Sequence, residues 1–154
     1  MNFTTATIHR TREFDYSVDA IYAHWTHPDA RQRWECGPDT GMKYDAFDTR
    51  EGGIEVVRIF NDGNEVGHMV QSHLKVVPNE CIATAVYGEF GGETTTIMSV
   101  LVEFTSTERG CKMEAVSQVA DLKGGNPQDD HEKGWDYVLG RFEDDLAEHG
   151  PINR

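Results

Sequence analysis

The sequence predicts an α+β domain in which an antiparallel sheet is covered by helices. Three observations lead to this class. A run of β-branched and charged residues opens the chain, alternating apolar and polar residues fill its middle, and one long amphipathic segment follows near the end. Because strands and helices occupy separate stretches, they favour an antiparallel sheet with helices on one face. The length of 154 residues fits a single domain over residues 1–154.

The charge balance limits the partners. Acidic residues number 27 against 14 basic ones, which gives a formal net charge of -13. Nucleic acid and anionic membranes would repel such a chain, so we expect neither as a partner. No apolar run approaches the ~20 residues of a membrane span, and MNFTTATIHR does not resemble a signal peptide. We therefore expect a cytoplasmic protein.

The three cysteines have no regular spacing. Cys36, Cys81 and Cys111 are an odd number, which favours reduced thiols. A bridge between Cys81 and Cys111 would require that their strands be neighbours.

The first third of the chain predicts one strand and two short helices. Residues 4–14 are typical of an exposed strand. Ser17 is a suitable N-cap for a helix that runs to about His27. Pro28 is suited to the first position of a helix, so we expect a second short helix that begins there and ends near Trp34.

From Met42 to Val119 the sequence predicts strands and turns. Asp62-Gly63 is a strong hairpin signal because both residues tolerate positive φ, and Gly67 suggests a bulge. The expected strands are 54–60, 65–77, 81–88, 94–104 and 111–122, and the expected turns or loops are 50–53, 61–64, 77–80, 88–93 and 105–110.

A long helix is predicted over about 127–148. Asn126 is a good N-cap before Pro127, and Gly150 followed by proline ends the helix. One apolar stripe should face the sheet: Trp135, Val138, Leu139, Phe142 and Leu146, with His131 and His149 on the same side. The acidic residues of the helix are interpreted as mainly a solvated face: Asp136, Glu143, Asp144, Asp145 and Glu148.

Alternation along three strands predicts which residues meet this helix. The expected inward sets are Met98, Val100, Val102 and Phe104; Cys111, Met113, Ala115, Ser117 and Val119; and, counted from an outward Lys75, His68, Val70, Ser72 and Leu74. Small and polar residues opposite a bulky helix suggest a cavity beneath the last two strands, near Trp135. Flexible methionines could equally fill such a space, so the pattern leaves core and cavity open.

Metal and catalytic signals are weak. His24 and His27 have a spacing that can share a metal, with Asp29 and Cys36 nearby, but no full ligand set is assignable, so we expect no metal. His68 and His73 should point to opposite faces of one strand.

An acid–base pair could involve His68 or His131, with Ser72 or Ser117 as a hydrogen-bond partner, although structural histidines are more common. Phosphate-loop, nucleophile-elbow and Cys-x-x-Cys motifs are absent from the sequence, and we expect no cofactor.

Four stretches together resemble one known family. FDYSVDAIYAHWTHPDARQRW resembles the opening motif of the START-like (SRPBCC, helix-grip, Bet v 1-like) superfamily. Its closest branch is the family named for the activator of the heat-shock chaperone ATPase. DTREGG, NDGNEVG with VVPNE, and HEKGWDYVLGRFEDDL resemble that family's turn, hairpin and terminal helix. The resemblance implies a helix-grip fold, with a curved antiparallel sheet wrapped around the long C-terminal helix and two short helices after the first strand.

The resemblance also implies a small hydrophobic ligand between sheet and helix, aromatic or lipid-like. The candidate pocket residues are His68, Ser72, Met98, Val100, Met113, Ala115, Ser117, His131, Trp135 and Leu139. Binding without catalysis is the first interpretation. A cyclase, hydratase or hydrolase using the same cavity is the second. A chaperone-associated or regulatory module with a filled core and an unspecified protein partner is the third, because fold alone does not settle function.

Overall fold

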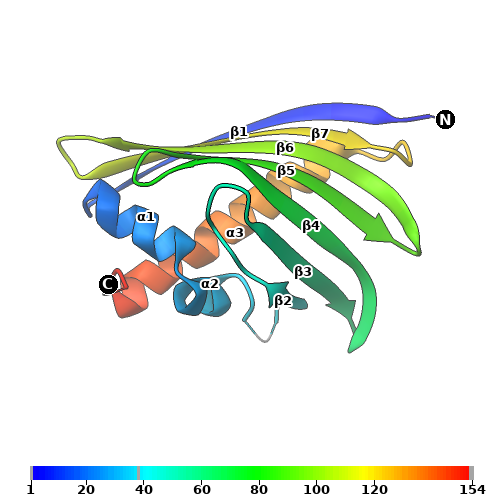
Figure 1. Cartoon of the computed structure of the whole chain (residues 1–154), viewed down its shortest axis with the longest axis horizontal. Helices are drawn as coiled ribbons and strands as arrows, with labels where there is room; N and C mark the ends of the chain where they lie inside the picture. The colour runs from blue at the N-terminus through cyan, green and yellow to red at the C-terminus, as the bar shows by residue number, and fades with distance from the viewer. Residues whose placement is uncertain (1, 38, 153–154) are drawn as a thin grey trace.

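The computed structural model describes residues 2–37 and 39–152. Within these residues it has seven strands and three helices (Figure 1). In chain order they are β1 (Thr4–Phe14), α1 (Val18–Thr26), α2 (Pro28–Trp34), β2 (Met42–Ala46), β3 (Ile54–Asn61), β4 (Asn64–Val77), β5 (Cys81–Phe90), β6 (Glu93–Ser106), β7 (Cys111–Asp121) and α3 (Pro127–His149). The predicted α+β class is confirmed.

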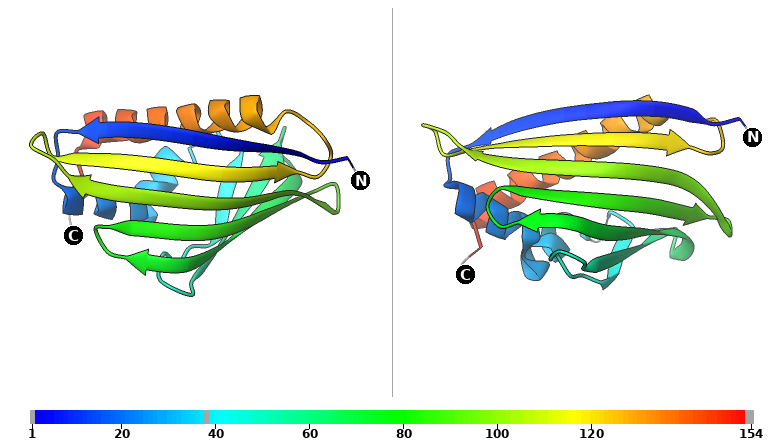
Figure 2. Two further views of the ribbon diagram at one scale, coloured as in Figure 1. Left: turned by 90° about the horizontal axis from the view of Figure 1, so that it is seen from above. Right: turned by 45° about the horizontal axis from the view of Figure 1, so that its top comes forward.

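All strands form one antiparallel sheet in the order β1-β7-β6-β5-β4-β3-β2. Each strand from β2 to β6 pairs with the next in sequence, and β7 pairs on its other side with β1. The sheet is strongly curved, and its hollow side faces α3 and the two short helices (Figure 2). This is the helix-grip arrangement expected from the sequence. Among the described residues, no helix is long and apolar enough to cross a membrane.

Two tight turns show how local residue chemistry sets the strand lengths. Asp62 and Gly63 adopt φ values of 51° and 78°, as a primed hairpin turn requires, so the predicted hairpin is confirmed. The predicted loop over 88–93 is wrong. Gly91 and Gly92 also take positive φ, 62° and 81°, which lets two residues close the turn. Strands β5 and β6 therefore continue to Phe90 and from Glu93.

The bulge predicted at Gly67 is confirmed by the pairing of β3 with β4. Ile59 pairs with Gly67 and Phe60 with Glu65, so one residue of β4 is left over. A side chain at Gly67 would overlap the backbone oxygen of Glu89 and the ring of Phe90. Glycine is therefore required where these strands approach each other closely.

The start of α3 follows the predicted capping, whereas Ser17 occupies the N-cap position of α1 without a side-chain hydrogen bond. Asn126 accepts a hydrogen bond from the backbone N–H of Asp129 at 3.2 Å, and Pro127 follows it. At α2 the cap is His27, whose Nδ1 accepts from the N–H of Asp29 at 3.1 Å. These two residues, considered as metal ligands from the sequence, thus form a helix cap.

Edge strand β1 is tied to α3 by charged pairs. The Arg10 guanidinium lies 2.7 Å from Asp136 and 3.1 Å from Glu132, and Arg12 lies 2.9 Å from Glu143. These arginines lie on the same face of the strand as the buried Ile8 and Phe14 and reach the acidic side of the helix. Asp136 and Glu143 are exposed, as expected of a solvated face, and they also form ion pairs with β1.

The packed core lies where the second half of α3 meets α1, α2 and the ends of β6 and β7. Phe142 is fully buried, and its ring makes edge contacts with Phe14, Trp25 and Trp34 at centroid distances of 5.2–5.5 Å. The predicted inward residues of β7 are all buried, and Val102 and Phe104 of β6 join them. The core therefore occupies only one end of the space under the sheet.

The cysteines remain free. Cys81 and Cys111 lie on β5 and β7, which are separated by β6, so the condition for a bridge between them is not met.

Candidate functional site

The other end of the space under the sheet is a cavity of about 450 Å³. Its lining residues come from strands β3 to β7, from α1, α2 and the segment that runs into β2, and from the first half of α3. In Figure 2 these helices lie on the hollow side of the sheet. Such a volume is within the range of small-molecule sites. The lining is mainly apolar: Trp25, Trp34, Met42, Val57, Met69, Ile82, Val86, Met98, Val100, Val102, Trp135 and Val138.

The structure brings together only some of the pocket residues predicted from the sequence. Met98, Val100, Ser117, His131 and Trp135 line the cavity. Met113, Ala115 and Leu139 are instead buried in the adjoining core. The cavity also extends to β3, beyond the last two strands to which the sequence assigned it.

The inward set predicted for β4 is wrong, namely His68, Val70, Ser72 and Leu74. The register of β4 against β5 shifts between His73 and Lys75, and Leu74 and Lys75 are both exposed. A bulge of this kind reverses the alternation, so counting back from Lys75 assigns every earlier residue to the wrong face.

With the bulge included, Met69, Gln71 and His73 face the cavity. His68 lies on the outer face, where its Nε2 is 3.2 Å from a carboxylate oxygen of Glu89. The prediction that His68 and His73 point to opposite faces is confirmed.

A polar cluster interrupts the apolar lining at β3, β4 and β5. Its centre is a carboxylate–imidazole pair, with Glu55 Oε1 at 2.5 Å from His73 Nε2. The hydroxyl of Thr49 donates to the same Oε1 at 3.0 Å, and His73 Nδ1 lies 2.9 Å from the hydroxyl of Thr84. Glu55 and His73 are 1% and 5% exposed. The imidazole is therefore fixed between two partners at the cavity wall.

The two oxygens of Glu55 have different surroundings. Oε1 accepts two hydrogen bonds, whereas Oε2 is buried and has no partner among the described residues. Glu55 lines the cavity. A buried carboxylate oxygen without a donor is costly, because it has lost its hydration. Among the buried side-chain polar atoms of the described residues, Oε2 of Glu55 is the one without a hydrogen-bond partner.

A second polar cluster, centred on Arg31, lies beside the first, and its buried side-chain polar atoms all have hydrogen-bond partners. The Arg31 guanidinium is stacked on the rings of Trp25 and Trp34, with its Cζ 4.9 and 4.5 Å from their centroids. It donates to the backbone oxygen of Trp25 and, at 3.0 Å, to Glu35 Oε2. The hydroxyl of Tyr44 donates to the same carboxylate at 2.7 Å.

The charges of this region account for the direction of its pKa shifts. Burial alone would lower the pKa of Arg31, but Glu35, Tyr44 and Glu55 raise it above its ordinary value. Burial, with the charge of Glu35, raises the pKa of Tyr44 well above 10.0. Arg31 is thus a permanent cation between two buried carboxylates, Glu35 and Glu55.

The first half of α3 supplies the remaining polar residues of the lining. His131 lies there with Asp130 and the half-exposed Tyr137. Burial lowers the pKa of His131 below 6.5 although the nearby acids Asp130 and Asp121 raise it. Gly134 faces open space, because a side chain there would meet nothing within 4 Å.

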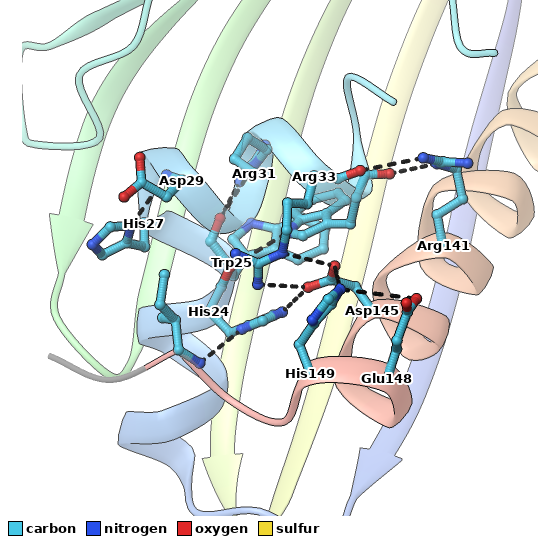
Figure 3. Close-up of polar contacts among 12 residues, drawn as sticks. His24, Trp25, His27, Asp29, Arg31, Arg33, Arg141, Asp145, Glu148 and His149 are labelled. Carbon is cyan, nitrogen blue, oxygen red and sulfur yellow. Dashed lines mark hydrogen bonds and ion pairs between the residues drawn. The ribbon is translucent and has the colours of Figure 1, made fainter. Parts of the chain in front are cut away.

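Of the two histidines considered as metal ligands, His24 belongs to a buried junction and His27 caps α2. His24 is buried, and its Nε2 lies 2.8 Å from Asp145, which also receives two hydrogen bonds from Arg33 at 3.1 Å (Figure 3). His27 points to Asp29 instead (Figure 3). No cluster of three or more metal-ligating side chains occurs within residues 2–37 and 39–152. Asp145 is therefore a buried residue that links α3 to α1 and α2, and it does not belong to the solvated face of the helix.

The sequence analysis did not identify Glu55, His73 or Thr84 as site residues. In IEVVRIF each face of the strand carries one charged residue, so alternation cannot decide whether Glu55 or Arg58 points inward. The inward position of His73 depends on the bulge at Leu74, which carries no glycine to signal it. His73 could have been assigned to the cavity from the sequence only if a bulge at Leu74 had been assumed.

Comparisons with known proteins agree with this architecture. A putative uncharacterised protein from Rhizobium leguminosarum has a similar structure, with a TM-score of 0.87, 22% identity, and coverage of 96% of this chain and 98% of that one. The Mll3558 protein from Rhizobium loti has a TM-score of 0.79 and 25% identity, with coverage of 94% of this chain and 97% of that one. A protein of unknown function from Staphylococcus aureus, SA2116, has a TM-score of 0.77 and 16% identity, with coverage of 95% of this chain and 96% of that one. These likenesses concern the fold.

Sequence comparison gives the family. No protein of curated function matches the chain significantly. The family model described as "Activator of Hsp90 ATPase homolog 1-like protein" matches residues 15–147, which is most of the chain. The four motifs and the helix-grip architecture are consistent with this match. The chain therefore belongs to the Activator of Hsp90 ATPase homolog 1-like family.

Proposed function

We propose that this protein binds a small, mainly hydrophobic molecule in the cavity between the sheet and α3. The observation that carries the proposal is the cavity itself, about 450 Å³ with a lining of tryptophan, methionine and aliphatic side chains. A few fixed polar groups in an apolar space are typical of sites for small organic ligands. The methionines Met69 and Met98 give the wall adaptability to ligands of different shape.

A matched pair of substitutions on β6 tests this proposal. Val100 lines the cavity, whereas its neighbour Leu101 is 37% exposed on the outer face. Val100→Trp should fill the space, and Leu101→Trp should leave it open. Calorimetric melting with a panel of two- and three-ring aromatic compounds measures the result, because a ligand that binds the folded state raises the melting temperature.

We expect some of these compounds to raise the melting temperature of the wild type and of Leu101→Trp, but not of folded Val100→Trp. If no compound shifts the wild type, or if Val100→Trp responds as the wild type does, the binding proposal is wrong.

One observation favours catalysis as a second candidate function. Glu55 and His73 are two titratable groups in direct contact at the cavity wall, as general acid–base chemistry requires. Thr84 holds the far side of the imidazole, which resembles the orientation of a catalytic base. Turnover of a bound hydrophobic ester, lost in His73→Gln with binding retained, would support an enzyme.

The third candidate is a chaperone-associated module, which the name of the family suggests. It needs no internal cavity, so the space beneath α3 favours ligand binding over this alternative. Raised melting temperatures without any bound partner protein would be the distinguishing result.

A further inference from the structure

We propose that the ligand carries a neutral hydrogen-bond donor, such as a phenolic or alcoholic hydroxyl, that donates to Oε2 of Glu55. This inference rests on the proposed function, since it assigns a chemical class to the molecule in the same cavity. The juxtaposition that carries it is a buried carboxylate oxygen without a partner at the wall of an apolar space.

The geometry of Glu55 explains why only one oxygen is available. An ionised carboxylate accepts hydrogen bonds and donates none, so the short contact requires that His73 Nε2 carry the proton. With the Thr49 hydroxyl, this satisfies Oε1. Nδ1 is then free to accept from the Thr84 hydroxyl. His73 and Thr49 thus act as positioning residues that hold Glu55 with Oε2 unpaired.

The neighbouring donors bond to groups other than Oε2 of Glu55. Arg31 already donates to the Trp25 backbone and to Glu35, and its contact with the indole rings of Trp25 and Trp34 helps to fix its direction. The hydroxyl of Tyr44 is likewise engaged with Glu35. A donor from the ligand completes the network, and a hydrogen bond to a buried charged acceptor is stronger than one between neutral groups.

The charge of this wall selects against an anionic head group. One cation, Arg31, faces the two carboxylates Glu35 and Glu55, and all three are nearly buried. A ligand carboxylate would add a further negative charge in a medium of low dielectric constant, where like charges repel strongly. A hydroxyl avoids that repulsion. The remaining apolar wall requires that the rest of the molecule be hydrophobic.

Four compounds on one ring system test this proposal by titration calorimetry. 2-Naphthol carries a donor, 2-methoxynaphthalene only an acceptor, 2-methylnaphthalene neither, and 2-naphthoate a negative charge. We expect the wild type to bind 2-naphthol about tenfold or more tighter than the methoxy and methyl compounds, as one charge-assisted hydrogen bond predicts. We expect 2-naphthoate to bind most weakly.

Two variants assign the preference to Glu55. In Glu55→Gln the carbonyl can accept from His73 while the amide N–H₂ takes the place of Oε2. The site then offers a donor, so 2-methoxynaphthalene should bind at least as well as 2-naphthol. Glu89→Gln is the matched control, because Glu89 forms the same kind of pair with His68 on the outer face. It should keep the wild-type preference.

The outcomes are distinguishable. If the wild type binds all four compounds with equal affinity, the donor proposal is overturned while the proposed function stands. If none of them binds, both fail for this class of molecule. If Glu55→Gln keeps the preference for 2-naphthol, Oε2 is not the acceptor. The wild-type series needs no variant, so a poorly folded Glu55→Gln still leaves the proposal open to refutation.

Discussion

Nε2 of His24 lies 2.8 Å from a carboxylate oxygen of Asp145, and both side chains are buried where α1 meets α3. On the other side of the imidazole, Nδ1 accepts a hydrogen bond from the backbone N–H of Ile152 at 3.0 Å. Because Nδ1 is an acceptor, the proton of the neutral ring is on Nε2 and is donated to Asp145. One neutral histidine thus connects the first helix, the last helix and the segment after it.

This junction predicts a loss of stability in mild acid. Burial lowers the pKa of His24 below its ordinary value, and the attraction of Asp145 does not offset burial together with the charges of Arg33 and His149. In the unfolded chain the histidine takes up a proton near pH 6.5, so below that pH the unfolded state binds more protons. The free energy of unfolding should therefore decrease as the pH falls from about 6.5.

The contribution of Asp145 belongs to a lower pH range. Burial would raise its pKa, but Arg33 and His24 lower it below 3.8, so its stabilising effect is present above that value and disappears as the pH falls through the folded pKa. Urea unfolding between pH 7.5 and 5 in wild type and His24→Gln measures the histidine effect. A decline in stability as steep in His24→Gln as in the wild type would contradict it.

Phe142→Ala should destabilise the protein by about 3–5 kcal/mol, as large truncations in a packed core do. Phe142 is fully buried at the centre of the aromatic cluster that joins α3 to α1 and α2. Denaturant unfolding measures the loss. Tyr137→Ala is a suitable control on the same helix, because that side chain is 49% exposed. A loss below about 1 kcal/mol for Phe142→Ala would mean that this contact is dispensable.

Arg31→Leu should cost about 3–5 kcal/mol, because it leaves the carboxylate of Glu35 buried without its cation. The double variant Arg31→Leu/Glu35→Leu should recover part of that loss, since the isolated charge is removed as well. Chemical unfolding of both variants gives the comparison. A double variant less stable than Arg31→Leu alone would show that packing of the arginine, and not its charge, dominates.

Gly140→Ala should stabilise the protein by about 0.5–1 kcal/mol. Gly140 lies inside α3, and a methyl group there would meet nothing within 4 Å. Alanine restricts the unfolded chain more than glycine and favours the helix. Thermal melting detects the gain. Gly134→Ala should behave alike because its surroundings are also open. Lower melting temperatures for both would mean that the helix needs its glycines.

Much of the fold could be predicted because its elements depend on local chemistry. The sequence places Asn126 and Pro127 at the start of α3 and Asp62-Gly63 at a hairpin, and the structure agrees. Alternation correctly oriented β6 and β7, which pair without a shift over residues 96–106 and 111–121. Regular pairing is what makes the period of two reliable.

The candidate site could be predicted only in part, because it depends on an irregularity. The bulge at Leu74 inverts the face of the preceding half of β4, so His73 and not Ser72 reaches the cavity. The pairing of Glu55 with His73 joins residues on two strands, and its geometry follows from their register. The motifs that predict the helix-grip fold carry no information about this pair, so its ligand-binding role stays a prediction.

The two ends of α3 bear different selective constraints. Phe142, Asp145 and Leu146 are fixed by the core and by the His24 junction, so changes there reduce stability. Gly134 and Val138, two turns and one turn before Phe142, line the cavity, where substitution alters its shape. Under the proposed function, mutation in the first half of the helix would change ligand preference while the second half keeps the fold stable. Divergence of ligand preference among relatives of similar fold should be concentrated there.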